Sequence, residues 1–456
     1  MSHQHNDSLK ITGGTLFDGS GTETDNPGLL VRNGRIEALG SAAVSASAAQ
    51  EFDASGCVIS PGFIDLCCNL REPGNGQKGN IASETRAAAH GGFTTVCASP
   101  ETSPVNDSSA VTHLIREGAD SRGSVRVLPV GAISWGLGGE MRGDMAGLRN
   151  AGCVAVGNGS RGVRNARILR RCMAYAQTFG LTVMFSPENQ ALAADGYSHD
   201  GQVATRLGLL GIPEVAETAA VMEMLLLAEE TGVKLHLSQL SSGRSVQMLA
   251  DARKRGIQVT ADVAMHQLCF TEEALAGFDS RFHVRPPLRS EADRQALVAG
   301  VRDGVIDAIV SQHQPHDSAA KQAPLPATEP GLSSIESVLS LGLELVARGE
   351  LERARLLSAL TAGPASVLGR NARLAEGEAA DLCVFAPEQS WQPSVQTLVS
   401  AGRHAPVLDR ELPGRVRLTL VAGRTVWADP ACPACPESAA EVVRPLSTLS
   451  QNPSCC

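Results

Sequence analysis

Eight short apolar runs, separated by amphipathic stretches, constrain the fold of this chain more than any other feature. The runs are Val58–Asp65, Thr94–Ala98, Val125–Gly131, Cys153–Gly157, Leu181–Phe185, Val233–Leu237, Ile257–Asp262 and Asp307–Ser311. Helical patterns lie between most of them, as in Val163–Phe179, Pro213–Thr231, Gly243–Arg255 and Glu291–Asp303. Strands that alternate with helices over about 250 residues predict an α/β protein with a (β/α)8, or TIM, barrel. A doubly wound open sheet is the alternative, but no Gly-x-Gly-x-x-Gly turn follows a strand here.

The two ends of the chain have a different pattern, with alternating polar and apolar residues. Near the start, Gly28–Ile36 contains the hairpin dipeptide Asn33-Gly34, and near the end Ala380–Phe385 and Val416–Trp427 are strand-like. We therefore expect both ends to form one small β-sandwich domain. The expected boundaries are 8–57 and 366–428 for the β domain, 58–365 for the barrel, and 429–456 for an unstructured tail.

Charge and composition exclude several classes of partner. The chain has a net charge of −9 and only 3% aromatic residues, which argues against a nucleic-acid partner. No apolar run approaches the roughly 20 residues that a membrane-spanning helix needs, so no membrane association is expected. Met1–Asn6 is polar and no apolar signal region follows it, which predicts a cytoplasmic protein.

The chain contains 12 cysteines. Those in the body of the chain, such as Cys97, Cys153 and Cys383, lie mostly in apolar runs, and we expect buried thiols rather than disulfides. Four lie in the Pro- and Ala-rich tail: Cys432, Cys435, Cys455 and Cys456. A Cys-Pro-Ala-Cys pair can bind zinc or form a disulfide, but the composition favours an unstructured tail.

Motifs at the ends of the predicted barrel strands resemble those of the dihydroorotase family of the amidohydrolase superfamily, a group of metal-dependent hydrolases. The resemblance runs from about residue 8 to residue 428, with matching order and spacing. It is carried by Pro61–Gly74, Ala87–Val96, Glu188, Val203–Leu209, His236-Leu237-Ser238, Arg285–Arg289 and His313–His316. It implies a barrel whose strand ends bind one or two zinc ions, and an activity on cyclic amides such as dihydroorotate.

The departures from the family pattern fall on the metal positions. The two histidines of the family's His-x-His-Leu-Arg signature correspond to Cys67 and Asn69, and a third histidine corresponds to Ser186. The bridging Lys or Asp falls in the window 152–160, which contains no Lys, Asp or Glu. The aspartate that serves as ligand and base corresponds to Gln312, whose amide cannot take a proton near neutral pH. Only His236 is kept.

These losses predict that the chain has no metal cofactor. A catalytic zinc normally needs three protein ligands and an open position. Cys67 and His236 supply at most two, so we expect no more than a weak site here. The expected assignment is therefore a pseudoenzyme with no catalytic residues.

The substrate-binding positions also differ. We expect a vestigial pocket around Arg71, Glu101, Arg285, His313 and His316. Arg71 is kept and suits a carboxylate, whereas Glu101 replaces an asparagine and would repel a dianionic substrate. Arg285 also replaces an asparagine, which suggests that Glu101 and Arg285 pair across the empty mouth. The stretch His316–Glu329 is polar and Pro-rich and predicts an exposed loop above it.

The pattern of losses is similar to that of the non-catalytic dihydroorotase-like chains that associate with bacterial aspartate carbamoyltransferase. The resemblance implies a structural or regulatory subunit in pyrimidine biosynthesis, bound to the carbamoyltransferase catalytic chain in a large hetero-oligomer. Two alternatives remain open at this point. One is an active cyclic-amide hydrolase with an atypical metal site, and the other is a sensor that binds a small molecule without turnover.

Overall fold

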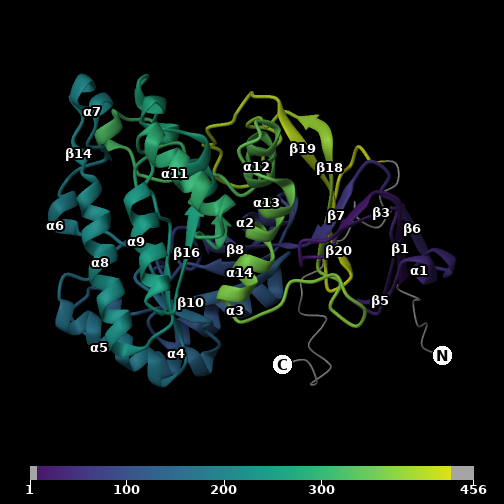
Figure 1. The fold of residues 1–456 in the computed structure, drawn as a ribbon, viewed down its shortest axis with the longest axis horizontal. Helices are drawn as coiled ribbons and strands as arrows, with labels where there is room; N and C mark the ends of the chain where they lie inside the picture. Colours follow the sequence, from purple (N-terminus) through teal and green to yellow (C-terminus); the bar gives the residue numbers. More distant parts are fainter. Residues whose placement is uncertain (1–7, 433–456) are drawn as a thin grey trace.

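The computed structural model describes residues 8–432, and the predictions for Cys435, Cys455 and Cys456 lie outside this range. A barrel and a smaller β domain lie side by side (Figure 1). The barrel sheet has eight strands in the order β17-β16-β15-β12-β11-β10-β9-β8, and its neighbours pair in parallel. The strands are β8 (Phe63–Cys68), β9 (Phe93–Ala98), β10 (Arg126–Ala132), β11 (Ala155–Gly157), β12 (Thr182–Phe185), β15 (Leu235–Leu237), β16 (Val259–Ala264) and β17 (Ala308–Val310). The predicted (β/α)8 barrel is confirmed.

The helices form the outer layer of the barrel, as Figure 1 shows. Each crossover between consecutive strands contains at least one of them, and three more follow β17. They are α2 (Ile81–His90), α3 (Ser109–Arg122), α4 (Met145–Ala151), α5 (Ala166–Thr178), α8 (Glu214–Thr231), α9 (Gly243–Lys254), α10 (Met265–Cys269), α11 (Glu291–Arg302), α12 (Val338–Ala347), α13 (Arg353–Leu360) and α14 (Ala362–Val367). Several begin at side-chain caps: Asn165, for example, accepts hydrogen bonds from the backbone N–H groups of Arg167 and Ile168.

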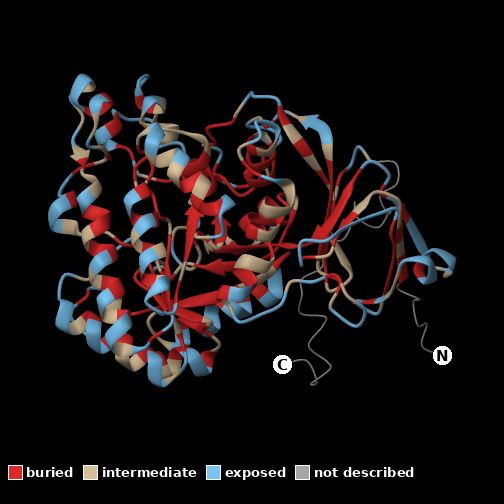
Figure 2. Ribbon diagram, in the orientation of Figure 1, coloured by how far each residue is buried: buried red, intermediate tan, exposed pale blue. Residues whose placement is uncertain are grey.

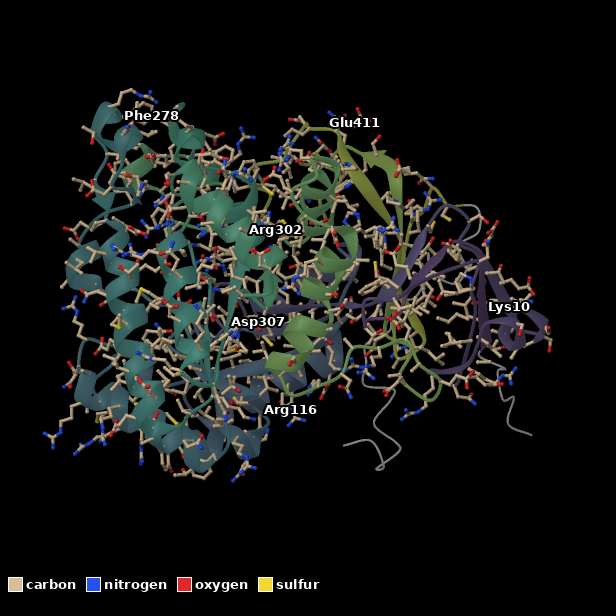
Figure 3. All side chains as sticks on the ribbon, viewed as in Figure 1. Lys10, Arg116, Phe278, Arg302, Asp307 and Glu411 are labelled. Atoms are coloured by element: carbon tan, nitrogen blue, oxygen red, sulfur yellow. The ribbon has the colours of Figure 1, made fainter. Side chains whose placement is uncertain are left out.

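Shorter elements occupy the loops beyond the carboxyl ends of the strands. They are α6 (Gln190–Ala193), α7 (Gln202–Leu207), the two-stranded β13 (Ser198–His199) and β14 (Gly211–Ile212), and the 3-10 turns η1 (Trp135–Leu137), η2 (Glu272–Leu275), η3 (Ser280–Phe282) and η4 (Leu325–Ala327). Loops at this end of a barrel surround the site at which barrel enzymes act. Figure 3 shows Phe278, from this loop layer, and Lys10, on the outer edge of the β domain, at opposite ends of the molecule.

The barrel closes through a buried carboxylate. Asp65 on β8 is fully buried, and its Oδ1 accepts hydrogen bonds from the backbone N–H of Ser311 at 3.0 Å and of Cys67 at 3.3 Å. The Ser311 hydroxyl donates to Oδ2. Beyond this point Cys68 pairs in parallel with His313. The last strand is thereby joined to the first. Burial raises the pKa of Asp65 to about 6, although these hydrogen bonds oppose the shift.

The barrel interior is filled mainly by small and branched side chains. Ile64, Val130, Ala155, Met184 and Ala308 belong to one buried apolar cluster inside the ring of strands. In Figure 2 the strands are almost entirely buried, whereas the outer helices alternate between buried and exposed faces. The core of the barrel therefore uses residues different from those at its mouth.

The β domain is built from both ends of the chain, with two sheets in the orders β5-β4-β1-β6 and β20-β19-β18-β7-β2-β3. One apolar cluster, including Ile11, Phe52, Val384 and Leu420, packs between them. The strands are β1 (Ser8–Thr12), β2 (Thr15–Phe17), β3 (Glu23–Asp25), β4 (Gly28–Arg32), β5 (Arg35–Leu39), β6 (Gln50–Asp53), β7 (Val58–Pro61), β18 (Leu382–Trp391), β19 (Leu412–Val421) and β20 (Arg424–Ala428), with the short helix α1 (Ser41–Ser45) beside β4. The predicted sandwich of both chain ends is confirmed.

Two expected boundaries differ from the structure. The apolar run Val58–Asp65 is two strands: β7 pairs with β18 in the β domain, and β8 enters the barrel only after Gly62. A Cβ at Gly62 would lie 2.0 Å from Thr94, so the chain passes from one sheet to the other at a position where a larger residue does not fit. Asp429, expected in the tail, is buried and forms ion pairs with Arg415 and Arg417. The described chain therefore remains attached to the β domain beyond residue 428.

The cysteines in the body of the chain are free thiols. None of the eight between residues 57 and 383 forms a disulfide; six are buried, and Cys67 and Cys269 are half-buried. Among residues 8–432, no helix has the length and apolar character to cross a bilayer.

Replacing Asp65 with asparagine tests how the buried carboxylate that joins the first and last barrel strands contributes to stability. The folded pKa of about 6 lies above the ordinary pKa of an aspartate, which is about 4. The folded state therefore holds this proton more tightly than the unfolded state, and the contribution of Asp65 to stability falls as the pH rises from about 4 to about 6. We expect Asp65→Asn, which keeps an acceptor for the Ser311 N–H, to lose this part of the pH dependence in urea unfolding. Asp65→Ala, which has no acceptor, should be destabilised by about 2 kcal/mol at any pH. Equal pH slopes for wild type and Asp65→Asn would contradict this account.

Candidate functional site

The residues singled out by the sequence lie at or near the carboxyl ends of the barrel strands, where one hydrogen-bonded network holds some of them and separate contacts hold the others. Cys67 and Gln312 are joined through a third residue, Gln239. His236 pairs with Asp262. Asn69, Ser186 and the substrate positions each have partners of their own. The chemistry of the mouth follows from these local arrangements.

Cys67 lies near the end of β8, where its Sγ accepts a hydrogen bond from Nε2 of Gln239 at 2.8 Å. Gln239 follows β15 and has a backbone φ of 61°, which is uncommon for a residue with a side chain. Burial raises the pKa of the Cys67 thiol well above its ordinary value, and the carboxylates of Asp65 and Asp262 add to this shift. The thiolate is the form that binds metal. Cys67 is therefore held as a neutral thiol.

Gln312 uses both amide hydrogens within the protein. Its Nε2 donates to Oε1 of Gln239 at 2.5 Å and to the carbonyl oxygen of Arg285 at 2.8 Å. Its Oε1 is buried and has no hydrogen-bond partner among the described residues. His266 is also buried, and burial lowers its pKa to about 4, although the Gln312 side chain opposes the shift. The position thus holds a fixed amide beside a neutral imidazole, and the amide cannot act as a base.

His236 is fully buried on β15, and both of its ring nitrogens are occupied. Nδ1 lies 2.8 Å from the Thr260 hydroxyl, and Nε2 lies 2.8 Å from Oδ2 of Asp262. The other carboxylate oxygen of Asp262 accepts the backbone N–H of Gln239 at 2.6 Å. A histidine that binds a metal presents the lone pair of one ring nitrogen to it. In this arrangement neither nitrogen is available without breaking a buried hydrogen bond.

The remaining two metal positions, Asn69 and Ser186, are held by local hydrogen bonds, at the side chain of Asn69 and at the backbone of Ser186. The side-chain oxygen of Asn69 accepts the backbone N–H of Arg71 at 3.0 Å, which fixes it in a local turn. Ser186 is held through its backbone by Asn158, which accepts the Ser186 N–H at 3.0 Å and donates to its carbonyl at 3.2 Å. Asn158 lies in the window that holds a bridging Lys or Asp in the family. Asn158 thus links the end of β11 to the end of β12 by hydrogen bonds.

Little space is left between these groups. A cavity of about 40 Å³ remains at the mouth, bordered by Cys67, Ser186 and Gln239 among others. Sites for drug-sized molecules usually measure about 300–1,000 Å³. Within residues 8–432, no three His, Cys, Asp or Glu side chains form a group that could hold a metal ion. The residues present therefore do not fit the zinc centre that the family pattern implies.

Arg71 and His316 belong to a buried polar cluster under the loop that follows β17. The Arg71 guanidinium donates to the carbonyl of Pro315 at 2.8 Å. Lys78 Nζ lies 3.3 Å from Nδ1 of His316, and Nε2 of that ring lies 2.9 Å from the Pro330 carbonyl. Nε2 also lies 3.1 Å from a guanidinium nitrogen of Arg71, which can only donate, so a neutral ring with its proton on Nε2 satisfies the Lys78 and Pro330 contacts but not this one. Burial and the neighbouring cations Arg71, Lys321 and Lys78 lower the pKa of His316 to about 3.

The loop 316–330 is exposed over much of its length, as expected, but it is fixed by a buried lysine. Lys321 is only 4% exposed. Its Nζ donates to the carbonyl oxygens of Ser280, His283 and Glu329 at 3.2, 3.3 and 2.6 Å. Burial lowers the pKa of Lys321 to about 7. These hydrogen bonds fix the loop against the protein surface.

His313 faces away from the mouth and joins the barrel to the segment that leads back to the β domain. Its Nε2 lies 2.7 Å from Oε2 of Glu84, and its Nδ1 accepts the backbone N–H of Ser334 at 3.2 Å. Ser400 also donates to Glu84, at 2.6 Å. Burial opposes a charged carboxylate here, but the hydrogen bonds from His313, Ser400 and Ser83 lower the pKa of Glu84 overall. His313 is thus a structural residue.

The predicted pairing of Glu101 with Arg285 is wrong. Arg285 instead forms a two-pronged ion pair with Glu188, at 2.9 and 2.7 Å. Glu101 accepts a hydrogen bond from the Ser160 hydroxyl at 2.5 Å. The loop after β12 brings Glu188 to Arg285, and a guanidinium favours a carboxylate that it can contact through two parallel hydrogen bonds. The sequence shows that Glu101 and Glu188 are both available as partners, but not which of their loops lies nearer to Arg285.

Three further residues of the mouth were not singled out as site residues by the sequence. Gln239 is hydrogen-bonded to both Cys67 and Gln312. Asn158 is hydrogen-bonded to the backbone of Ser186, and His266 lies beside Gln312. The only signal for Gln239 is its position, three residues after the kept histidine at a strand end. Asp262 is the last residue of the predicted run Ile257–Asp262, and its partner His236 could be inferred only from the pairing of β15 with β16.

Comparison with known proteins agrees with this architecture. A family model described as dihydro-orotase-like matches residues 56–245. A "Dihydroorotase-like protein" of Pseudomonas aeruginosa is 48% identical over 91% of this chain and 98% of its own length, and a "Dihydroorotase" of Anaeromyxobacter dehalogenans is 40% identical over 92% and 98%. Among solved structures, an L-hydantoinase (dihydropyrimidinase) from Arthrobacter aurescens superposes with a TM-score of 0.83 at 22% identity over 92% of this chain and 96% of that one.

Identities of 40–48% over nine-tenths of the chain are far beyond what a shared barrel alone produces. The likeness to the hydantoinase, at 22% identity, extends the fold to more distant hydrolases. The barrel, the two-ended β domain and the order of the motifs therefore have one explanation: this chain belongs to the dihydroorotase-like family of the amidohydrolase superfamily.

Proposed function

We propose that this chain is a non-catalytic member of its family that acts in the cytoplasm as a structural and regulatory subunit of aspartate carbamoyltransferase, in pyrimidine biosynthesis. One observation carries the proposal: the side chains at four of the metal positions are hydrogen-bonded to neighbouring side chains or to the backbone. His236 uses both ring nitrogens, Cys67 accepts an amide hydrogen from Gln239, and Gln312 uses both amide hydrogens. A hydrolase of this type needs a metal-bound hydroxide and a base, and these groups supply neither.

The substrate side of the mouth supports the same proposal. Arg71 donates to a backbone carbonyl and Arg285 is paired with Glu188. A dianionic substrate would have to compete with these internal acceptors. It would also meet the carboxylate of Glu101, and it would need more room than the cavity of about 40 Å³ offers.

The rest of the barrel is well packed, which suits a subunit whose role is structural. Its interior cluster, its seam at Asp65 and its β domain are fully packed. The core of a barrel and its site depend on different residues, so selection can maintain one without the other. The resemblance noted in the sequence supplies the identity of the partner, the carbamoyltransferase catalytic chain.

Metal analysis and a stability measurement together test the loss of catalysis. We expect purified full-length protein to contain substoichiometric zinc and to show no hydrolysis of dihydroorotate above the buffer rate, even after incubation with zinc. His236→Ala should lower the free energy of unfolding by about 2 kcal/mol, because it leaves Asp262 and Thr260 without their buried partner. It should leave the zinc content unchanged. Stoichiometric zinc that is lost in His236→Ala, together with measurable turnover in the wild type, would establish the atypical-hydrolase alternative instead.

Co-expression with the aspartate carbamoyltransferase catalytic chain of the same organism tests the partner. We expect the two chains to elute together in size-exclusion chromatography with light scattering, at a mass well above that of either chain alone. Gln239→Ala serves as the matched control, because it disrupts the mouth network and should leave assembly unchanged. Separate elution of the wild-type chains at every mixing ratio would refute the subunit role.

A further inference from the structure

Helix α5 has one buried stripe and one exposed basic stripe. Leu169, Cys172, Met173 and Ala176 pack into the core. Arg167, Arg170 and Arg171 lie on the solvent side at helical spacing. Figure 1 places α5 on the side of the barrel away from the β domain. The surface discussed below, the α5 face, consists of Arg167, Arg171 and Tyr175 on this helix and Trp135, Met141 and Arg142 on the neighbouring loop.

The neighbouring loop presents large apolar side chains to solvent. Ser134 and Arg142 form an antiparallel bridge, and the backbone N–H of Trp135 donates to the carbonyl of Met141 at 2.9 Å, which closes the loop. Trp135 is 54% exposed and Met141 is 61% exposed. The guanidinium carbon of Arg142 lies 3.5 Å from the centroid of the Tyr175 ring, which holds the loop against α5. An open groove of about 720 Å³, whose walls include Met141, Ala174 and Tyr175, lies between them.

The charge of this region is opposite to that of the whole chain. Residues 140–171 contain seven arginines, no lysine and two acids, Glu140 and Asp144, in a chain of net charge −9. Arg170 is paired with Glu230 through three hydrogen bonds. Arg167 and Arg171 are exposed, and no partner is recorded for their side chains within residues 8–432. Arg167 and Arg171 therefore present two exposed cations on the same helix as Tyr175, and Arg171 and Met141 both border the groove.

We propose that the α5 face is a docking surface for a protein partner that presents carboxylates around an apolar side chain. Trp, Tyr, Arg and Met are the residue types enriched at protein interfaces, and Trp, Tyr and Arg dominate their binding energy. Carboxylates on the partner would satisfy Arg167 and Arg171 with two-pronged hydrogen bonds, and the groove would receive the apolar side chain. The inference rests on the proposed function, in which the partner is the carbamoyltransferase catalytic chain. A nucleic acid fits less well, because the exposed Trp135 and Met141 and the apolar side chains of the groove suit a protein side chain better than a phosphate backbone.

Charge reversal on α5, with a matched control, tests the proposal. We expect Arg167→Glu/Arg171→Glu to weaken binding of the purified carbamoyltransferase chain by roughly 10-fold or more in titration calorimetry at 0.15 M salt. Arg86→Glu/Arg244→Glu changes the net charge equally, at exposed arginines of α2 and α9 for which no side-chain partner is recorded, and should bind within about 2-fold of the wild type. Trp135→Ser/Met141→Ser removes the apolar part and should also weaken binding. Circular dichroism melts show whether each variant is folded.

The outcomes separate this inference from the function on which it rests. If the wild-type chains bind and Arg167→Glu/Arg171→Glu binds equally well, the docking surface lies elsewhere and the inference fails while the proposed function stands. If the wild-type chains do not bind at all, the proposed function itself fails. A 20-nucleotide RNA that binds the wild type at 0.15 M salt, and fails to bind Arg167→Glu/Arg171→Glu, would also overturn docking of a protein at this face.

Discussion

Burying polar atoms is costly unless each finds a partner, and this constraint shapes the whole mouth of the barrel. In a metal-dependent hydrolase a cation compensates the imidazoles and carboxylates that converge on the strand ends. Here most of the compensation is internal, although Oε1 of Gln312 has no partner among the described residues. Asp262 receives His236 and the backbone of Gln239, Asp65 receives Ser311, and the Gln239 amide is shared by Cys67 and Gln312. The hydrogen bonds that hold the strand ends together are thus the same ones that close the site.

The sequence predicted the architecture well because strand and helix periodicities are local signals. All eight predicted runs overlap the strands of the barrel, and both chain ends enter the β domain. The error at Val58–Asp65 has a simple cause. Apolar character continues through Pro61-Gly62, so nothing in the composition of the run shows that the chain leaves one sheet and enters another. Only the pairing of β7 with β18 reveals it.

The sequence predicted which residue types stand at the metal and substrate positions, but it did not predict the hydrogen-bond and ion-pair partners of those residues. Substitution at the metal positions could be found by comparing residue types with the family pattern, since ligand chemistry depends on the residue itself. Partners depend on loop paths, and loops are the part of a barrel that sequence specifies least. Arg285 pairs with Glu188 rather than Glu101 for this reason. Gln239 reaches both Cys67 and Gln312 from a backbone with φ of 61°, which its residue type does not signal.

The Gln239 bridge has an evolutionary consequence. A return to Asp at position 312 alone would remove the amide hydrogens that bind Gln239 and Arg285, and would add a negative charge to a network that already contains Asp262. A return to His at position 67 alone would require a larger ring where Gln239 now packs. Each of these single substitutions breaks a buried contact, so a change toward the family's ligands would need several positions to change together. The internal network therefore opposes stepwise restoration of the family's ligand set.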